Sequence, residues 1–237
     1  MKLRTIIIIS SFFTPAMASA ITVALNSVAE TTLNASSTSN NMGGHAQFHV
    51  GHTNEDAARR GLLRFDVSTI PATAIISSAT LELTIPSGNT SGTPSFATHK
   101  MLTSWGEGNK IGNNGDAAVT GEATWNSNGT VAWAAPGAGS GTDYVAGASA
   151  STTVAVFGNY TWSAAGTTAD VQSWVDGTSA NNGWIMLETT PTTGSARRFS
   201  ANAAPTLTIE YTVVPEPTSA ALLGLGGIAL LMRRRKP

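Results

Sequence analysis

Three of the four histidines lie within eight residues, at His45, His49 and His52. On a helix this spacing would place the three rings on one face, as in many zinc sites. Glycines flank the segment, however, and Phe48 and Val50 alternate with polar neighbours, which favours a strand. A strand rises roughly 3.3 Å per residue, so it would separate His45 from His49 by about 13 Å. We therefore expect solvated strand and turn histidines and no metal site.

The acidic residues suggest no clear catalytic pair. Glycoside hydrolysis needs two carboxylates within roughly 5 to 10 Å of each other. Glu107, Asp116 and Glu122 fall in one Gly-rich region and could converge, as could the acids of any such loop. The side-chain oxygens of Asn113, Asn114 and Asp116 could instead hold Ca²⁺, although their spacing matches no EF-hand. We expect no cofactor, with calcium as the alternative, and no enzyme activity.

Other chemistries are excluded by what the chain lacks. It has no cysteine, and therefore no thiol nucleophile, thiolate metal site or disulfide. It has no Gly-x-Ser-x-Gly and no nucleotide-binding motif. Six of the 13 basic residues lie near the two ends, whereas 13 of the 14 acids lie between them, which leaves the central part with a net charge of about −6. That balance argues against nucleic acid as a partner.

The six tryptophans lie among polar, Gly-rich stretches. Indole faces can stack on the apolar faces of sugar rings while neighbouring polar groups bond the hydroxyls. Trp105, Trp125 and Trp133 are the candidates for such contacts, and Trp133 is the least constrained. Core filling is the alternative for each of them, and we expect it for Trp174 and Trp184.

The arginines provide a second way to hold a sugar. Arg59, Arg60 and Arg64, together with the pair Arg197 and Arg198, could clamp the carboxylate of an acidic sugar. The alternative, which we favour at this stage, is that they pair with the excess acids of the central part.

Alternating side chains predict the strands that would position these residues. Leu62, Arg64 and Asp66 alternate with Leu63, Phe65 and Val67; Leu81, Leu83 and Ile85 share one face of a strand; and Leu207, Ile209 and Tyr211 share one face of the last strand. Further strands are expected near residues 47–50, 98–103, 153–157, 184–188 and 197–200. Turn residues separate them at Pro71, residues 86–88, 113–115 and 181–183.

One segment has a helical pattern instead. Val171, Trp174 and Val175 follow an i, i+3, i+4 spacing, with Asp170 as a capping residue before them and Gly177 after them. We predict a helix of one or two turns there. Short strands at regular spacing with almost no helix predict an all-β jelly-roll β-sandwich in one domain, residues 21–213.

The two ends predict export. Residues 1–20 have a basic start, an apolar stretch from Ile6 to Phe13, and small residues up to Ala20, as in a signal peptide removed after Ala18 or Ala20. Residues 214–237 combine Pro215, Glu216 and Pro217, then an apolar run from Ala220 to Met232, then Arg233, Arg234, Arg235 and Lys236. The apolar run is short for a membrane span of about 20 residues. Its composition nevertheless predicts a transmembrane helix whose terminal cations stay cytoplasmic.

The order of these three C-terminal parts resembles the PEP-CTERM sorting signal of Gram-negative bacteria. The resemblance implies a membrane-embedded exosortase as the processing partner, besides signal peptidase. Pro215, Glu216 and Pro217 match the three defining positions of that signal. The resemblance to this signal further implies an inner-membrane intermediate and a final location at the cell surface or in the extracellular matrix.

Several stretches of the central part resemble the DNRLRE domain. They are RGLLRFDVSTIP at residues 60–71, IISSATLEL at 75–83, TSWGEG at 103–108, ATWN at 123–126, the predicted helix with Asn182-Gly-Trp184, RRFS at 197–200 and PTLT at 205–208. The resemblance implies a jelly-roll sandwich, and some members of that family are carbohydrate-binding modules. The segment between Trp105 and Trp125 departs from the family pattern, because it is long and Gly-rich.

Three hypotheses follow for function. The first is a non-enzymatic envelope or matrix protein that binds extracellular polysaccharide. The second is a purely structural surface or biofilm protein without a specific ligand. The third, and weakest, is a polysaccharide-degrading enzyme.

Overall fold

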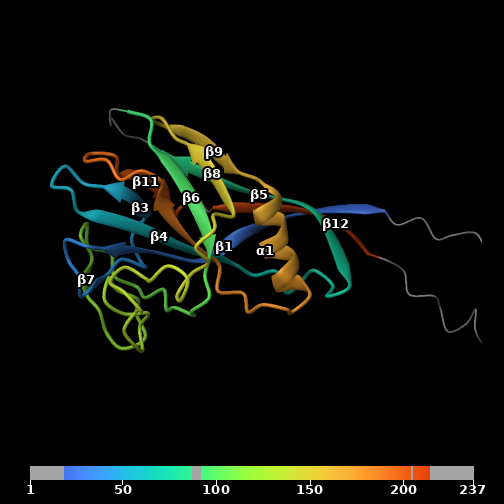
Figure 1. Cartoon of the computed structure of the whole chain (residues 1–237), viewed down its shortest axis with the longest axis horizontal. Coiled ribbons are helices and arrows are strands. Elements are labelled where there is room, and N and C mark those ends of the chain that lie inside the picture. Colours follow the sequence, from blue (N-terminus) through green and yellow to red (C-terminus); the bar gives the residue numbers. More distant parts are fainter. Residues whose placement is uncertain (1–18, 87–91, 204, 214–237) are drawn as a thin grey trace, which may run out of the picture.

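The computed structural model describes residues 19–86, 92–203 and 205–213 (Figure 1). This part of the chain is mostly β-structure with one short helix, as the sequence predicts. The elements are β1 (Ala20–Asn34), β2 (Asn40–Asn41), β3 (Gln47–His52), β4 (Ala58–Phe65), β5 (Ala74–Ile85), β6 (Ser95–Lys100), β7 (Asp116–Ala117), β8 (Ala150–Thr153), β9 (Gly158–Trp162), α1 (Ala165–Val175), β10 (Trp184–Glu188), β11 (Arg197–Ser200) and β12 (Thr206–Val213).

The main sheet curves until its two ends approach each other. Its strand order is β8-β6-β10-β4-β1-β12-β5-β9, with β3 paired to β4 and β11 paired to β3. The first half of β1 pairs with β12 and the second half with β4, and the register shifts between Ser27 and Ala29. The outermost strands β8 and β9 meet through the Thr152 hydroxyl, which donates to the carbonyl of Thr161. This nearly closed arrangement is consistent with a β-sandwich or barrel.

The predicted alternation fills the main core. Leu81, Leu83 and Ile85 from β5 and Leu207, Ile209 and Tyr211 from β12 all lie buried in one cluster, which confirms those two strands. β4 is buried on both faces, because Leu63 and Phe65 belong to this cluster whereas Leu62 packs on the other side of the sheet. Apolar residues on both faces are what a strand needs when both its surfaces are covered.

The long segment between β6 and β8 supplies that second cover. Residues 101–149 bring Met101, Trp105, Ala123, Trp133, Ala138 and Tyr144 against Ala29, Leu33, Leu62 and Ile185 of the sheet, and these ten residues form a second core. The segment is therefore packed along much of its length. Its backbone is anchored by side chains such as Asn41, whose amide donates to the carbonyls of Glu107 and Ala123.

Two of the predicted strands are displaced. The strand expected at residues 98–103 is β6 and ends at Lys100, and the one expected at 153–157 falls largely on the turn between β8 and β9. After that turn β9 begins at Gly158, whose φ of 139° is rarely adopted by residues with a side chain. The turn is also braced by Ala155, whose backbone N–H donates to the hydroxyl of Tyr160. The strands expected at 47–50, 184–188 and 197–200 are confirmed as β3, β10 and β11.

The helix starts earlier than predicted. α1 begins at Ala165, and its N-cap, Ala164, makes no side-chain capping bond. Asp170 lies inside the helix, where its carboxylate accepts hydrogen bonds from the Trp184 indole (2.8 Å) and the Ser149 hydroxyl. The prediction that Asp170 caps the helix was wrong because this carboxylate serves tertiary packing. Close packing also sets the start, since a Cβ at Gly166 would lie 2.4 Å from the Ser149 carbonyl oxygen.

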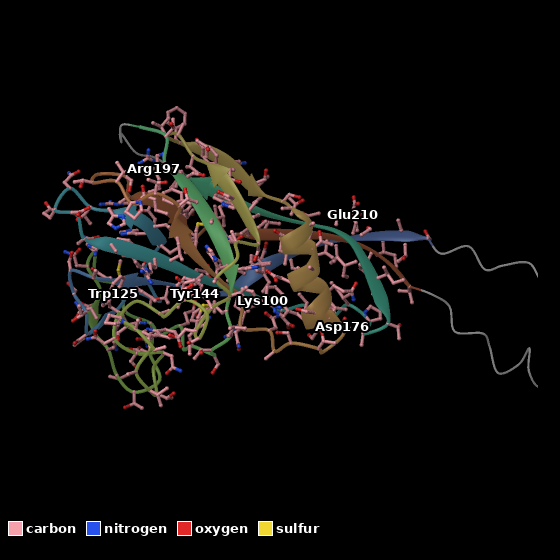
Figure 2. All side chains as sticks on the ribbon, viewed as in Figure 1. Lys100, Trp125, Tyr144, Asp176, Arg197 and Glu210 are labelled. Carbon is pink, nitrogen blue, oxygen red and sulfur yellow. The ribbon has the colours of Figure 1, made fainter. Side chains whose placement is uncertain are left out.

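No helix within the described residues is long and apolar enough to cross a membrane. The predicted transmembrane helix and sorting motif, residues 214–237, lie outside the described residues. So does the predicted signal peptide, apart from its last two residues. β1 and β12 are the first and last described strands, and Figure 2 shows side chains along both of them.

Candidate functional site

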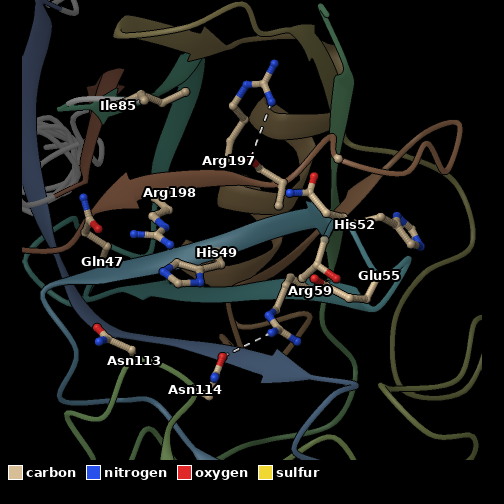
Figure 3. Close-up of a pocket in the computed structure, with 14 residues that line it drawn as sticks. Gln47, His49, His52, Glu55, Arg59, Ile85, Asn113, Asn114, Arg197 and Arg198 are labelled. Carbon is tan, nitrogen blue, oxygen red and sulfur yellow. Dashed lines mark hydrogen bonds between the residues drawn. The ribbon is translucent and has the colours of Figure 1, made fainter. Parts of the chain in front are cut away.

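A polar cavity of about 670 Å³ lies where β3, β4, β5 and β11 end and the segment around residues 113–114 meets them (Figure 3). Three arginines line it, Arg59, Arg197 and Arg198, with Glu55 as its one acidic residue. Histidines and amides complete the polar lining: Gln47, His49, His52, Asn54, Asn113 and Asn114. A cavity of this size falls within the range that holds small ligands.

Strand alternation decides which side chains of β3 and β11 face the cavity. Phe48 pairs with Phe199 across the two strands, and their rings stack in the main core at 5.4 Å between centroids. The neighbouring pair, His49 and Arg198, therefore points to the opposite face. Arg198 is exposed there, and its guanidinium has no hydrogen-bond or ion-pair partner among the described residues, so it is available to a ligand.

Arg59 is held deep in the wall. It comes from β4, is 6% exposed, and donates to the side-chain oxygens of Asn34, Ser36 (3.2 Å) and Asn114 (3.5 Å). These acceptors are neutral. Burial lowers the pKa of the Arg59 guanidinium, and the Glu55 carboxylate acts in the opposite direction. Arg59 therefore brings a positive charge to the cavity that its hydrogen-bond partners do not neutralise.

Arg197 faces the core side of β11 instead. Its guanidinium donates to the carbonyls of Ala155 (2.6 Å), Ser195 (2.8 Å) and Gly92 (2.9 Å). These bonds tie three loops together at the cavity rim, so Arg197 supports the shape of the cavity.

The expectation that the arginines pair with the body's acids is wrong for four of the five. Within the part of the chain that the structure describes, the ion pairs are His52–Glu188, Lys100–Asp170 and Lys110–Glu122. None of them includes Arg59, Arg60, Arg64 or Arg198. Lys100, Lys110 and His52 pair with three of the acids, while Arg60 and Arg64 lie over the rings of Trp125 (5.1 Å) and Trp105 (5.2 Å).

His49 is a neutral group inside this basic wall. It is 8% exposed, and its Nε2 is buried without a hydrogen-bond partner among the described residues. Burial lowers its pKa to about 3, and the charges of Arg198, His45 and Arg59 act in the same direction. A buried ring nitrogen without a partner can hydrogen-bond a ligand hydroxyl or water that enters beside it.

The predicted separation of the histidines was wrong. The rings of His45 and His49 lie 5.6 Å apart, because His45 belongs to the turn before β3 and folds back toward it. His52 turns to the Glu188 carboxylate (2.8 Å), which also accepts the Ser195 hydroxyl (2.6 Å). No group of three or more His, Cys, Asp or Glu side chains among the described residues is placed to hold a metal ion.

The calcium candidates lie at the cavity and its edge, with their oxygens already engaged. Asn113 Oδ1 lies 3.4 Å from His45 Nε2, Asn114 Oδ1 accepts from Arg59, and Asp116 accepts from the backbone N–H of Gly112 (3.0 Å). The cations beside Asn114 oppose a divalent ion. Calcium binding stays a prediction.

The three acids that could have formed a catalytic pair are used separately. Glu107 accepts from the backbone N–H of Glu30 (2.9 Å), and Asp116 from Gly112. Glu122 accepts from the backbone N–H groups of Val119 (2.9 Å) and Asn109 (3.2 Å) and pairs with Lys110. Each carboxylate stabilises the fold of the 101–149 segment, so the geometry offers no support for hydrolysis there.

The candidate sugar-stacking tryptophans lie in the second core. Trp105 and Trp133 are each 5% exposed, and their indole N–H groups donate to the carbonyls of Asn182 (2.8 Å) and Thr124 (2.9 Å). Trp125 is half-buried under Arg60. Their contact with sugar stays a prediction, and the core-filling alternative accounts for Trp105 and Trp133. Trp174 and Trp184 are core residues as predicted, with ring centroids 4.5 Å apart.

Most of the cavity residues stand out in the sequence by their type, but nothing along the chain groups them. Residues 47–59, 113–114 and 194–198 meet only because β11 pairs with β3 and because Asn34 and Asn40 donate to the backbone at residues 114–115. The alternation in Gln47-Phe-His-Val50 was a usable signal, since this stretch places apolar residues on one face and polar residues on the other, whereas in Arg197-Arg-Phe-Ser200 Arg197 shares the face of Phe199.

A β-rich body with a polar, arginine-lined cavity is the architecture of a binding module. The chain belongs to carbohydrate-binding module family 96, whose model matches residues 21–173. The PEP-CTERM protein-sorting motif matches residues 213–236. Both resemblances found in the sequence are thereby confirmed. A comparison with curated proteins gave no match. The sorting motif indicates an exported protein that is processed at the envelope of a Gram-negative bacterium.

Proposed function

We propose that this protein is an exosortase-processed envelope or matrix protein whose body binds extracellular polysaccharide without cleaving it. The main support for the position of the binding site is the distribution of the arginines. Of the five arginines in an acidic body, three line one cavity, and Arg198 is exposed there without an acidic partner. Family membership supports carbohydrate as the ligand and a non-catalytic role. The passage of β1 between the two halves of the sheet supports the jelly-roll assignment.

The lining favours an acidic sugar. A guanidinium can bind a carboxylate through two parallel hydrogen bonds. Amides such as Asn113 and Gln47 and the neutral ring of His49 suit sugar hydroxyls. The net charge of the body, about −6, would repel a polyanion. At physiological ionic strength, however, exposed charges are screened beyond about 8 Å, so the arginines nearest the ligand dominate.

Replacing Arg198 by alanine is expected to weaken binding of a polyuronate by roughly 10- to 100-fold. The reason is that a hydrogen bond to a charged group contributes about 1.5–3 kcal/mol. Calorimetric titration of residues 19–213 with polygalacturonate would measure the change. Arg198→Lys keeps the charge but loses the planar guanidinium that can form two parallel hydrogen bonds. The affinity of this variant should lie between those of the wild type and Arg198→Ala.

Arg64→Ala is the matched control, because it removes the same charge from the outer face of β4. Equal losses in Arg198→Ala and Arg64→Ala would assign the effect to overall charge and reject the cavity. Repeating the titration with a chelator tests the calcium alternative.

Glu216→Ala is expected to block processing, so that the full-length chain accumulates in the inner membrane. The reason is that the substitution removes the central residue of the sorting motif. Cell fractionation with immunoblotting would measure size and location. Glu210→Ala, on the exposed face of β12, is the control and should be processed normally. Wild-type size and location for Glu216→Ala would show that the motif is not used.

A further inference from the structure

The two ends of the described body leave it side by side. β1 and β12 are antiparallel neighbours in which Ala20 lies opposite Thr212. Neighbouring strands are about 4.8 Å apart, so the start of β1 and the end of β12 share one edge of the molecule. In Figure 1 the start of β1 and the end of β12 lie on the same side of the body, at the right. We call it the tail end, defined by Ala20, Thr212 and Val213.

The cavity lies at the opposite end. Ala74, the first residue of β5, pairs with Val213 at the tail end, whereas Ile85, the last residue of β5, lines the cavity. Eleven residue steps at about 3.3 Å place the two roughly 35 Å apart. The course of β1 independently places the cavity far from the tail end. This strand starts at Ala20, at the tail end, and ends at Asn34, which accepts a hydrogen bond from the cavity residue Arg59. In Figure 2, Arg197 and Glu210 lie toward opposite ends of the body.

The tail is short compared with this distance. Six residues, 214–219, separate Val213 from the apolar run that starts at Ala220. Seven residue steps span at most about 25 Å when fully extended. A chain held by its apolar run must therefore keep its tail end within about 25 Å of the membrane.

From this geometry we infer that the cavity faces away from the membrane while the tail still holds the protein in it. The membrane-held chain and the released body then bind polysaccharide with the same affinity, and capture of the polymer does not wait for processing. The affinity part of this inference rests on the proposed function. The orientation part does not depend on a glycan ligand. It rests on the strand register, the position of the cavity and the predicted hold of the short tail in the membrane.

Orientation can be measured without any glycan. The chain has no cysteine, so single cysteines can carry a fluorescent donor at Asn54→Cys, in the cavity wall, or at Glu210→Cys, near the tail end. The full-length Glu216→Ala chain is placed in lipid nanodiscs whose headgroups carry an acceptor. We expect strong energy transfer from position 210 and at least several-fold weaker transfer from position 54. Equal transfer from both positions, or failure of the chain to enter the nanodiscs, would overturn the inference.

The affinity for polysaccharide is then measured for two forms of the protein, the nanodisc-held chain and the purified body. Polygalacturonate should bind the nanodisc-held chain and the purified body, residues 19–213, with dissociation constants within about twofold of each other. Binding by the body but not by the nanodisc-held chain would overturn the inference and leave the proposed function intact. Binding by neither form, with the expected energy transfer, would reject the proposed function and leave the orientation standing.

Discussion

Replacing Trp133 by alanine should lower the free energy of unfolding by about 3 to 5 kcal/mol, the range found when large aromatic side chains are removed from a core. Trp133 packs in the second core, where it joins the 101–149 segment to the outer face of the sheet. The substitution leaves a cavity and also removes the donor to the Thr124 carbonyl. A loss of polysaccharide binding in this variant would therefore reflect unfolding rather than a missing sugar contact.

Urea denaturation of residues 19–213, followed by tryptophan fluorescence and circular dichroism, measures this effect. Val131→Ala is the control, because Val131 is two residues away but 61% exposed. Exposed substitutions of this kind change stability by less than about 0.5 kcal/mol. If Trp133→Ala retains wild-type stability but no longer binds polysaccharide, then Trp133 is a ligand contact and the assignment to the core is wrong.

Stability should also depend on pH through His49. The pKa of this histidine is about 3 in the folded protein, against 6.5 for an ordinary histidine. The unfolded chain therefore takes up the proton first, and the protein loses stability as the pH falls from about 6.5 toward 3. Each pKa unit corresponds to about 1.4 kcal/mol. At pH 4 the loss from His49 alone amounts to roughly 3 kcal/mol.

His49→Asn removes this contribution, so the measurement is the difference between two pH profiles. Free energies of unfolding are determined at pH 7 and pH 4 for the wild type and the variant. The wild type should lose roughly 3 kcal/mol more than the variant between the two values, because all other titrating groups are common to both. Parallel profiles would mean that His49 is accessible to protons in the folded state, in contradiction to its burial.

The parts of the fold that follow from local pattern were predictable. Residues 79–85 of β5 and 207–211 of β12 alternate, and their apolar faces are buried as expected. The extent of α1 was not predictable, because residues 165–169 include weak helix formers, Gly and Thr, whose placement is decided by packing against Ser149. The sequence also contains no local sign of the second core. Trp105 is surrounded by polar residues and glycine along the chain, and it meets Trp133 and the apolar residues of the sheet only in space.

The candidate site, like the second core, could be predicted from the sequence only in part. His49, Arg59, Arg198 and Asn113 were each singled out by residue type, but the contacts that join them depend on pairing between β3 and β11, which are about 150 residues apart. The interaction partners of the arginines could also not be predicted without the three-dimensional structure. Their pairing with acids was favoured by the net charge of the body, whereas the structure gives the acids other partners. The tail differed, since its three parts are contiguous and their order alone identified the sorting motif.

The most direct test of the central claim is a titration of the wild-type body, residues 19–213, with polygalacturonate and with the neutral polymer dextran. The account predicts saturable binding of the acidic polymer and at least tenfold weaker binding of the neutral one. Absence of saturable binding to either polymer would contradict the claim and favour a structural envelope protein without a specific ligand. Equal binding of both would retain carbohydrate recognition but reject the arginine-lined cavity as its basis.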